Sequence, residues 1–519
     1  MRVSAILDLL RAAPPARVLE PDRALAWAGA LSELAGVPDI HPRSLAVSGE
    51  RLFCLAGSPR ANGRLIVLSE QPVSGLEGEE RECELGSARA RLRVCPWSAA
   101  AADLLREALD FLRPRTLGCA ASFGFGDRLG LATPGHARAC ARFDLAPVFA
   151  QQSIREMART GRSPQEVMDD ALFGVLRQGF DAGFGADADH LKETADVERC
   201  FAAGFTLFTF DPSDHVEAAA DRMDPAALEQ RAAALPWDAL ETSLAESLAR
   251  CEGASLDGRA MGRERVLRVL VKVGRALARV ASMARHLEGL ARDAGRQVEI
   301  EISMDEADSA TAADEHFLVA SELRRLGVEW IGLAPRFEGR FEKGVDYIGE
   351  LATFERCLAG HARVARELGP YKLSLHSGSD KLSIYAALAR GTGGAFHVKT
   401  AGTSWLEALR VLAAERPGLF REILALARER YAADRRTYHV SARLEKVPGP
   451  DALDEAGLPA LLDDFDARQV LHVTFGSVVE RFSTRLLEAL AGCEQSYLSA
   501  LDAHFARHLA PLAKRGGET

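Results

Sequence analysis

The stretch Tyr371–Ser383, YKLSLHSGSDKLS, alternates apolar and polar side chains with the period of a β-strand. Leu373 and Leu375 would lie on one face, and three polar residues would lie on the other: Lys372, Ser374 and His376. The SGSD sequence that follows would form a turn. A parallel strand covered on both faces is normally almost entirely apolar, because a buried polar group loses its hydrogen bonds to water. The polar face therefore predicts that this strand contributes to a chemical site.

Similar segments, each a short strand-like run that ends in polar residues and precedes a helical pattern, recur along the chain. They are TLGCAASFGFGDRLG, APVFAQQS, GFGADADHLK, FTLFTFDPSDH, VEIEISMDE, VEWIGLAPR, KLSLHSGSDK and GAFHVKTAG. Strands that alternate with helices predict parallel βαβ units, and about eight of them close a TIM-type (β/α)8 barrel. We expect an α/β protein with a small N-terminal α/β unit (1–114), a barrel (115–410) with a helical insertion around 212–297, and a mainly helical C-terminal extension (411–519).

Composition and charge narrow the class of protein. Hydrophobic residues make up 47% of the chain and charged residues 27%, which is typical of a globular protein. The net charge of -10 disfavours nucleic acid as the main partner. No segment has the pattern of a signal peptide or a membrane span, and the nine cysteines are widely spaced, as reduced thiols are. We expect a cytoplasmic protein that acts on a small molecule, and a homo-oligomer is compatible with the sequence.

Three histidines fall at the expected ends of strands: His190, His376 and His397. Each alone is more often a structural residue. Together with neighbouring carboxylates they would meet at the mouth of one barrel, because catalytic groups in this fold lie at the carboxyl ends of the strands. Mixed nitrogen and oxygen ligands predict a divalent cation, and Zn, Mn, Ni and Co all suit such a set.

Charged residues near the same strand ends supply further candidates. The acidic ones are Asp187, Asp189, Asp211, Glu301, Asp305 and Glu306. Asp211 and Asp305 also fit ordinary turn and helix-cap chemistry, whereas the alternation predicts that Glu301 points deep into the barrel. The basic residues could hold a carboxylate or a phosphate; they are Arg128, Lys192, Arg336, Lys381 and Lys399.

Motifs for other chemistries are weak or absent. GFGDRLG has three residues between its last two glycines, so it matches the dinucleotide-binding fingerprint poorly. The sequence has no P-loop and no Gly-x-Ser-x-Gly elbow. We therefore expect no nicotinamide cofactor.

Several longer phrases resemble the tagaturonate/fructuronate epimerase family of bacterial hexuronate catabolism. They are SFGFGDRLGLATPGH, EISMDE, WIGLAPRFEGRFEKGVDYIG, YKLSLHSGSDKLS, FHVKTAGTSWLEALR and DARQVLHVTFGSV, between about residues 115 and 478. The resemblance implies a metal-dependent 4-epimerase that interconverts D-tagaturonate and D-fructuronate. It also implies that Asp189 accepts a proton, that Glu301 donates one, and that His190 and His376 bind the metal.

Strand direction suggests His397 as the third metal ligand. Substrate binding is expected at Lys399, Lys381, Arg336 and Asp127, with one of the cations pairing with the C6 carboxylate.

The position of the reacting carbon limits the mechanism. In a 2-ketose the C4 proton is not adjacent to the carbonyl, so epimerisation requires either oxidation of the C4 hydroxyl or retro-aldol cleavage of the C3–C4 bond. Without a nicotinamide motif we favour the retro-aldol route, which requires a Lewis acid and acid/base groups on both faces of the C4 oxygen. The alternatives are another metal-dependent isomerase or aldolase for ketoses or sugar acids, and a non-catalytic sensor of carbohydrate acids.

Overall fold

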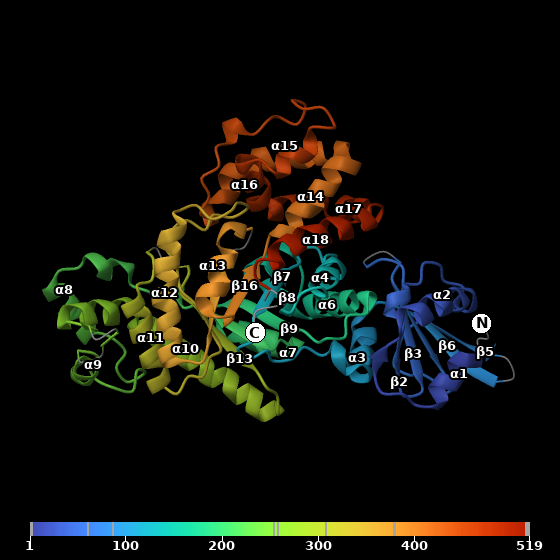
Figure 1. The fold of residues 1–519 in the computed structure, drawn as a ribbon, viewed down its shortest axis with the longest axis horizontal. Coiled ribbons are helices and arrows are strands. Elements are labelled where there is room, and N and C mark those ends of the chain that lie inside the picture. Colours follow the sequence, from blue (N-terminus) through green and yellow to red (C-terminus); the bar gives the residue numbers. More distant parts are fainter. Residues whose placement is uncertain are drawn as a thin grey trace. The chain divides into compact units, whose positions relative to one another are not determined.

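A computed structural model gives the fold and describes residues 4–59, 62–85, 88–252, 255–256, 259–306, 309–376 and 380–513. Within these residues, eight strands close into one barrel in chain order (Figure 1). They are β7 (Ser122–Gly126), β8 (Ala146–Ser153), β9 (Gly185–Leu191), β10 (Leu207–Phe210), β13 (Glu299–Ser303), β14 (Gly332–Ala334), β15 (Lys372–His376) and β16 (Phe396–Thr400). Each predicted segment contains one of these strands, so the predicted barrel is confirmed.

Neighbouring strands from β9 to β16 pair in parallel, which requires a crossover between them. Along the whole barrel, helices supply most of the connections between successive strands: α4 (Thr133–Cys140), α5 (Ile154–Thr160), α6 (Pro164–Gln178), α7 (Thr194–Ala203), α10 (Arg263–Ala294), α11 (Ala313–Arg325), α12 (Leu351–Leu368) and α13 (Leu382–Thr392). An insertion precedes α10 and contains η3 (Ser213–His215), η4 (Ala218–Arg222), α8 (Pro225–Ala233), α9 (Leu244–Cys251) and the short strands β11 (Ser255–Leu256) and β12 (Arg259–Ala260).

The chain forms two compact units. The first contains 1–115, 125–186 and 401–510, and the second contains 116–124, 187–400 and 511–519. The N-terminal part of the first unit is an antiparallel sheet in the order β1 (Arg17–Val18), β2 (Ala46–Ser48), β3 (Arg51–Ala56), β4 (Arg64–Ser69), β6 (Ala88–Pro96), β5 (Glu79–Leu85). Two helices, α1 (Ser4–Arg11) and α2 (Pro21–Ala35), share a buried apolar core with this sheet, which includes Trp27, Leu31, Leu52 and Ile66.

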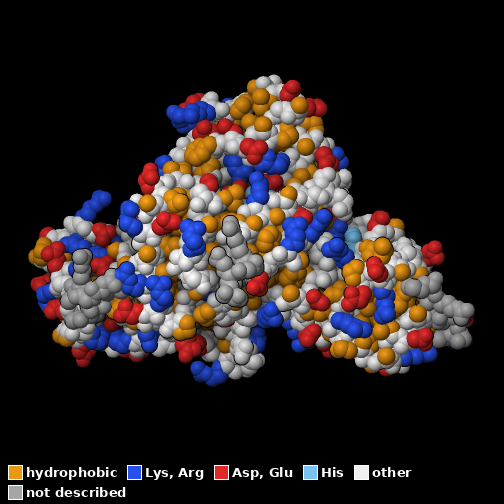
Figure 2. All heavy atoms as spheres, in the orientation of Figure 1, with side chains coloured by type: hydrophobic (Ala, Val, Ile, Leu, Met, Phe, Trp, Pro, Cys, Tyr) orange, Lys and Arg blue, Asp and Glu red, His pale blue; other side chains and the backbone are white. Residues whose placement is uncertain are grey.

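Helices also dominate the C-terminal part of the first unit. They are α14 (Thr403–Glu415), α15 (Pro417–Asp434), α16 (Phe465–Val473), α17 (Phe475–Ala491) and α18 (Glu494–Leu509), and α3 (Ala99–Ala108) lies earlier in the chain. None of the helices described is long and apolar enough to cross a membrane. Acidic and basic side chains are interspersed over the face shown in Figure 2, as is typical of a solvated surface.

The register of the barrel strands explains the polar face of the opening stretch. Ser374 pairs with His397, and His376 pairs with Lys399 on the next strand. These side chains share the interior with Glu301, which is fully buried, whereas Leu373 and Leu375 lie on the opposite face of β15. Residues 377–379 of the same stretch, where we expected a turn, lie outside the described residues.

Candidate metal and catalytic site

Strand β9 contains one extra residue at the point where the site begins. Phe208 of β10 pairs with Ala188, whereas Phe210 pairs with Leu191, so β9 spans the same stretch with an additional residue. His190 has a φ of +52°, in the left-handed region that residues with a side chain rarely adopt. Adjacent residues of a regular strand face opposite sides, but this bulge allows Asp189 and His190 to lie together, with His190 Nε2 3.8 Å from Asp189 Oδ1.

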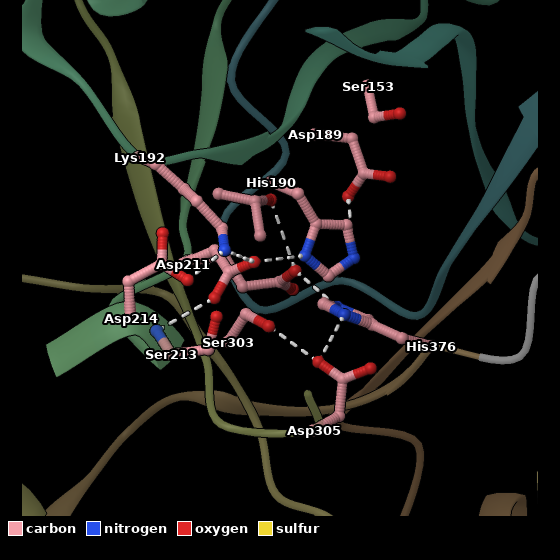
Figure 3. A network of polar contacts seen from close by, with 12 residues as sticks. Ser153, Asp189, His190, Lys192, Asp211, Ser213, Asp214, Ser303, Asp305 and His376 are labelled. Carbon is pink, nitrogen blue, oxygen red and sulfur yellow. Dashed lines mark hydrogen bonds and ion pairs between the residues drawn. The ribbon is translucent and has the colours of Figure 1, made fainter. Parts of the chain in front are cut away.

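Three side chains from separate parts of the barrel meet at its mouth (Figure 3). His190 ends β9, His376 ends β15 and Asp305 follows β13, and each offers a ligand atom within 4.8 Å of the others. The centroids of the two imidazole rings lie 5.2 Å apart. His376 Nδ1 lies 3.0 Å from Asp305 Oδ1, and His376 Nε2 lies 2.7 Å from Glu301 Oε1.

The charge around these imidazoles favours a bound cation. Burial lowers the pKa of His190, but Asp189, Asp305 and Asp211 more than offset it and raise the pKa to about 10. Burial acts in the same way on His376, where Asp305 and Glu301 raise the pKa to about 9. A divalent cation would neutralise the same carboxylates in place of these protons, and two nitrogens with one oxygen form a suitable donor set. His190, His376 and Asp305 therefore fit a divalent metal.

Lys399 joins the carboxylates inside the barrel. Its Nζ lies 2.7 Å from Asp187 Oδ2, 2.9 Å from Asp189 Oδ1 and 2.7 Å from Glu301 Oε1. Burial would lower the pKa of this ammonium, but the three carboxylates raise it well above its usual value.

The surroundings shift the pKa of the three carboxyls in different directions. Burial raises the pKa of Glu301 and of Asp189, but Lys399 and the neighbouring histidines more than offset it and hold both carboxyls well below their usual range. For Asp187 burial dominates and raises the pKa to about 6. Asp189 and Glu301 are therefore ionised, and both contact the same ammonium.

Two of the predicted substrate-binding cations are engaged by the protein itself. Lys399 is held by the three carboxylates described above. Lys381 is fully buried, and its Nζ donates to the carbonyl oxygens of Glu342 (3.0 Å) and Val345 (2.5 Å). Neither ammonium points into open solvent, and the substrate-binding role expected of the two lysines stays a prediction.

The remaining predicted residues lie in three different places. His397 is fully buried, its Nδ1 lies 2.9 Å from Ser122 Oγ, and burial lowers its pKa to about 3. The group of possible metal ligands formed by His190, His376 and Asp305 does not include it. In the first unit, Asp127 accepts hydrogen bonds from backbone N–H groups over residues 129–133 and so caps the start of α4. Arg336 Nη1 lies 3.4 Å from the carbonyl oxygen of Asp305.

Sequence reasoning undervalued two residues of this site. Asp305 and Asp211 were ascribed to turn and cap chemistry, yet Asp305 joins the ligand group and Asp211 Oδ2 lies 3.3 Å from His190 Nδ1. Asp211 still makes the turn contact, because its Oδ1 accepts the backbone N–H of Ser213. The available signal was position, since Asp211 directly follows β10 and Asp305 lies two residues beyond the end of β13.

A closed barrel with imidazoles and carboxylates gathered at the carboxyl ends of its strands defines a barrel enzyme. A family model described as tagaturonate epimerase matches residues 41–512. The tagaturonate/fructuronate epimerase of Thermotoga maritima is 39% identical over 447 residues, which cover 86% of this chain and 91% of that protein. The chain belongs to the tagaturonate epimerase family and is an enzyme of the isomerase class, a carbohydrate epimerase.

Solved structures agree with this assignment. The native crystal structure of the fructuronate-tagaturonate epimerase UxaE from Cohnella laeviribosi is 34% identical, with a TM-score of 0.84, and the match covers 94% of this chain and 99% of that one. A complex of the same enzyme with two glycerol molecules is 33% identical, with a TM-score of 0.85 and coverage of 94% and 100%. The resemblance inferred from the sequence is confirmed at the level of the family.

Proposed function

We propose that the chain interconverts D-tagaturonate and D-fructuronate in a metal-dependent 4-epimerisation. The observation that carries this proposal is the convergence of His190, His376 and Asp305 beside the ionised pair Asp189 and Glu301. The names of the relatives support the substrate pair.

The metal would be held by His190, His376 and Asp305. The third ligand differs from the one that strand direction suggested, because His397 lies among Ser122 and other buried groups. When bound, a divalent cation acts as a Lewis acid for the ketone oxygen and the neighbouring hydroxyl, where negative charge develops.

The two carboxylates would handle the protons at C4. Asp189 accepts the proton of the C4 hydroxyl, and the C3–C4 bond breaks to give an aldehyde at C4 and a three-carbon fragment that carries an enediolate at C2 and C3. The aldehyde turns its other face to the enediolate, the C3–C4 bond forms again, and Glu301 gives a proton to the new C4 oxygen. Because Glu301 is ionised at rest, that proton comes from the Lys399 ammonium, 2.7 Å from Glu301 Oε1, and the proton taken by Asp189 returns to Lys399 Nζ, 2.9 Å away.

Lys399 would act as a positioning residue in this scheme. Its ammonium contacts both Asp189 and Glu301, so it fixes the separation of the two proton-transfer groups. Ser374 adds a further hydrogen bond to Glu301 Oε2. Held in this way, neither carboxylate needs to reorganise when charge moves on the substrate.

An NMR time course with D-tagaturonate tests the function. We expect fructuronate to appear, to stop appearing after chelation, and to return when Mn, Ni, Co or Zn is added. Three-carbon products in place of the epimer would indicate an aldolase, and tight binding without turnover would indicate a sensor. Full activity in metal-free protein would refute the metal dependence.

A further inference from the structure

The extra residue in β9 also sets the direction of Lys192. Leu191 pairs with Phe210, it is fully buried, and its carbonyl accepts the backbone N–H of Asp211 at 2.9 Å. Side chains alternate along a strand, so Lys192 leaves the chain on the side opposite Leu191. That side carries Asp211 and the mouth of the barrel.

The ammonium of Lys192 lies close to the proposed metal ligands. Its Nζ lies 3.9 Å from Asp211 Oδ2, and the same oxygen lies 3.3 Å from His190 Nδ1. Figure 3 shows the ammonium, the carboxylate and the imidazole in succession. The Lys192 side chain is 39% exposed, so solvent and a substrate can reach it.

Among the residues that the structure describes, the shortest ion pair of this ammonium is with an exposed residue. Lys192 Nζ lies 2.7 Å from Asp214 Oδ1, and the side chain of Asp214 is 67% exposed. Ion pairs of this kind contribute little, because water screens them and two long side chains must be ordered. A substrate carboxylate can therefore replace Asp214 at small cost.

The backbone of Lys192 is held firmly while its ammonium remains accessible. Arg279 of α10 donates from Nε (3.2 Å) and from Nη2 (2.5 Å) to the carbonyl oxygen of Lys192. The same guanidinium pairs with Glu193 at 2.7 Å. Lys192 differs in this from Lys399 and Lys381, whose ammonium groups are buried and bound by protein oxygens.

We propose that Lys192 binds the C6 carboxylate of the sugar acid and thereby makes the enzyme prefer a uronate to a neutral ketohexose. The inference rests on the proposed function, which supplies the substrate, and adds a residue that determines specificity. A carboxylate at Lys192 forms a charge-assisted hydrogen bond, whereas a CH2OH group at C6 does not exploit the charge.

Three variants test the proposal, with D-tagaturonate compared with the ketohexose that carries CH2OH at C6. Lys192→Met should raise KM for the uronate about 10- to 100-fold and leave kcat, metal content and the rate on the neutral sugar nearly unchanged. Lys192→Arg should restore most of the affinity. Asp214→Asn should lower KM for the uronate by up to about fivefold, because it removes a competing anion.

The outcomes separate this inference from the proposed function. A Lys192→Met enzyme with unchanged KM would overturn the inference, and so would an equal loss of rate on both sugars. A wild-type enzyme that does not epimerise tagaturonate would refute the proposed function. In that case calorimetric binding of tagaturonate to the wild type and to Lys192→Met still decides whether Lys192 holds the carboxylate.

Discussion

Replacing Asp305 with Asn distinguishes the ligand group proposed from the structure from the one that strand direction suggested. Asp305 contributes the only carboxylate among the three proposed ligands, and its Oδ1 lies 3.0 Å from His376 Nδ1. Asn keeps the size of the side chain but removes the charge. Changing a residue that merely supports a metal ligand weakens binding about 10- to 100-fold, so loss of a ligand should cost about 100-fold or more, about 2.7 kcal/mol.

The matched control is His397→Gln. His397 is fully buried and its Nδ1 meets Ser122 Oγ at 2.9 Å, so this variant should lose stability but keep the metal. Competition between the protein and a fluorescent chelator measures the dissociation constant, and circular dichroism shows that each variant is folded. The reasoning is refuted if Asp305→Asn retains wild-type affinity while His397→Gln loses it.

Three further predictions follow from buried groups of the second unit. Lys399→Met should lower the free energy of unfolding by about 3–5 kcal/mol, because buried carboxylates lose their shared cation; urea denaturation measures the loss, and adding Asp187→Asn should recover part of it. Burial lowers the pKa of His361 to about 4 in the folded protein, so this imidazole binds a proton at a higher pH in the unfolded chain than in the folded one. The free energy of unfolding should therefore fall by about 3 kcal/mol for this group as the pH drops from about 6.5 to about 4. His361→Gln should flatten that dependence of the urea midpoint, and an unaltered slope would contradict the assignment. In Gly332→Ala the new Cβ would lie 2.7 Å from Glu301 Oε2, so kcat should fall about 100-fold with the metal retained, and wild-type kinetics would argue against the crowding.

The barrel was predictable because its strands carry a local pattern. Alternation in β13, β15 and β16 assigns inward and outward faces, and the pairing of Ser374 with His397 agrees with it. The charged edge strand β5 (Glu79–Leu85, EERECEL) was not predicted, because its sequence has little apolar character. Among the described strands it pairs with β6 alone, and charged residues are common on edge strands, where they discourage association with other chains.

The site was only partly predictable, because strand direction gives the face of a side chain but not its depth or its partners. His397 does point inward, but it lies two residues before Lys399 on β16. This separation places His397 about 6.6 Å deeper in the barrel than Lys399. Asp305 reaches the imidazoles from beyond the end of β13, and no alternation describes that segment. The partners of Lys399 come from strands far apart in the sequence, so its engagement by carboxylates required the closed barrel.

The pair Asp189 and His190 shows most clearly where the alternation of a regular β-strand no longer predicts the direction of the side chains. If β9 were regular, only one of these neighbours could face the interior, whereas the register change between Phe208 and Phe210 brings both to the mouth. The conformation has a cost, since a φ of +52° at a residue with a side chain is unfavourable by about 1–2 kcal/mol. Glycine would remove that cost and would also remove the imidazole. A histidine at such a position is better explained by what its ring does than by the stability of the strand.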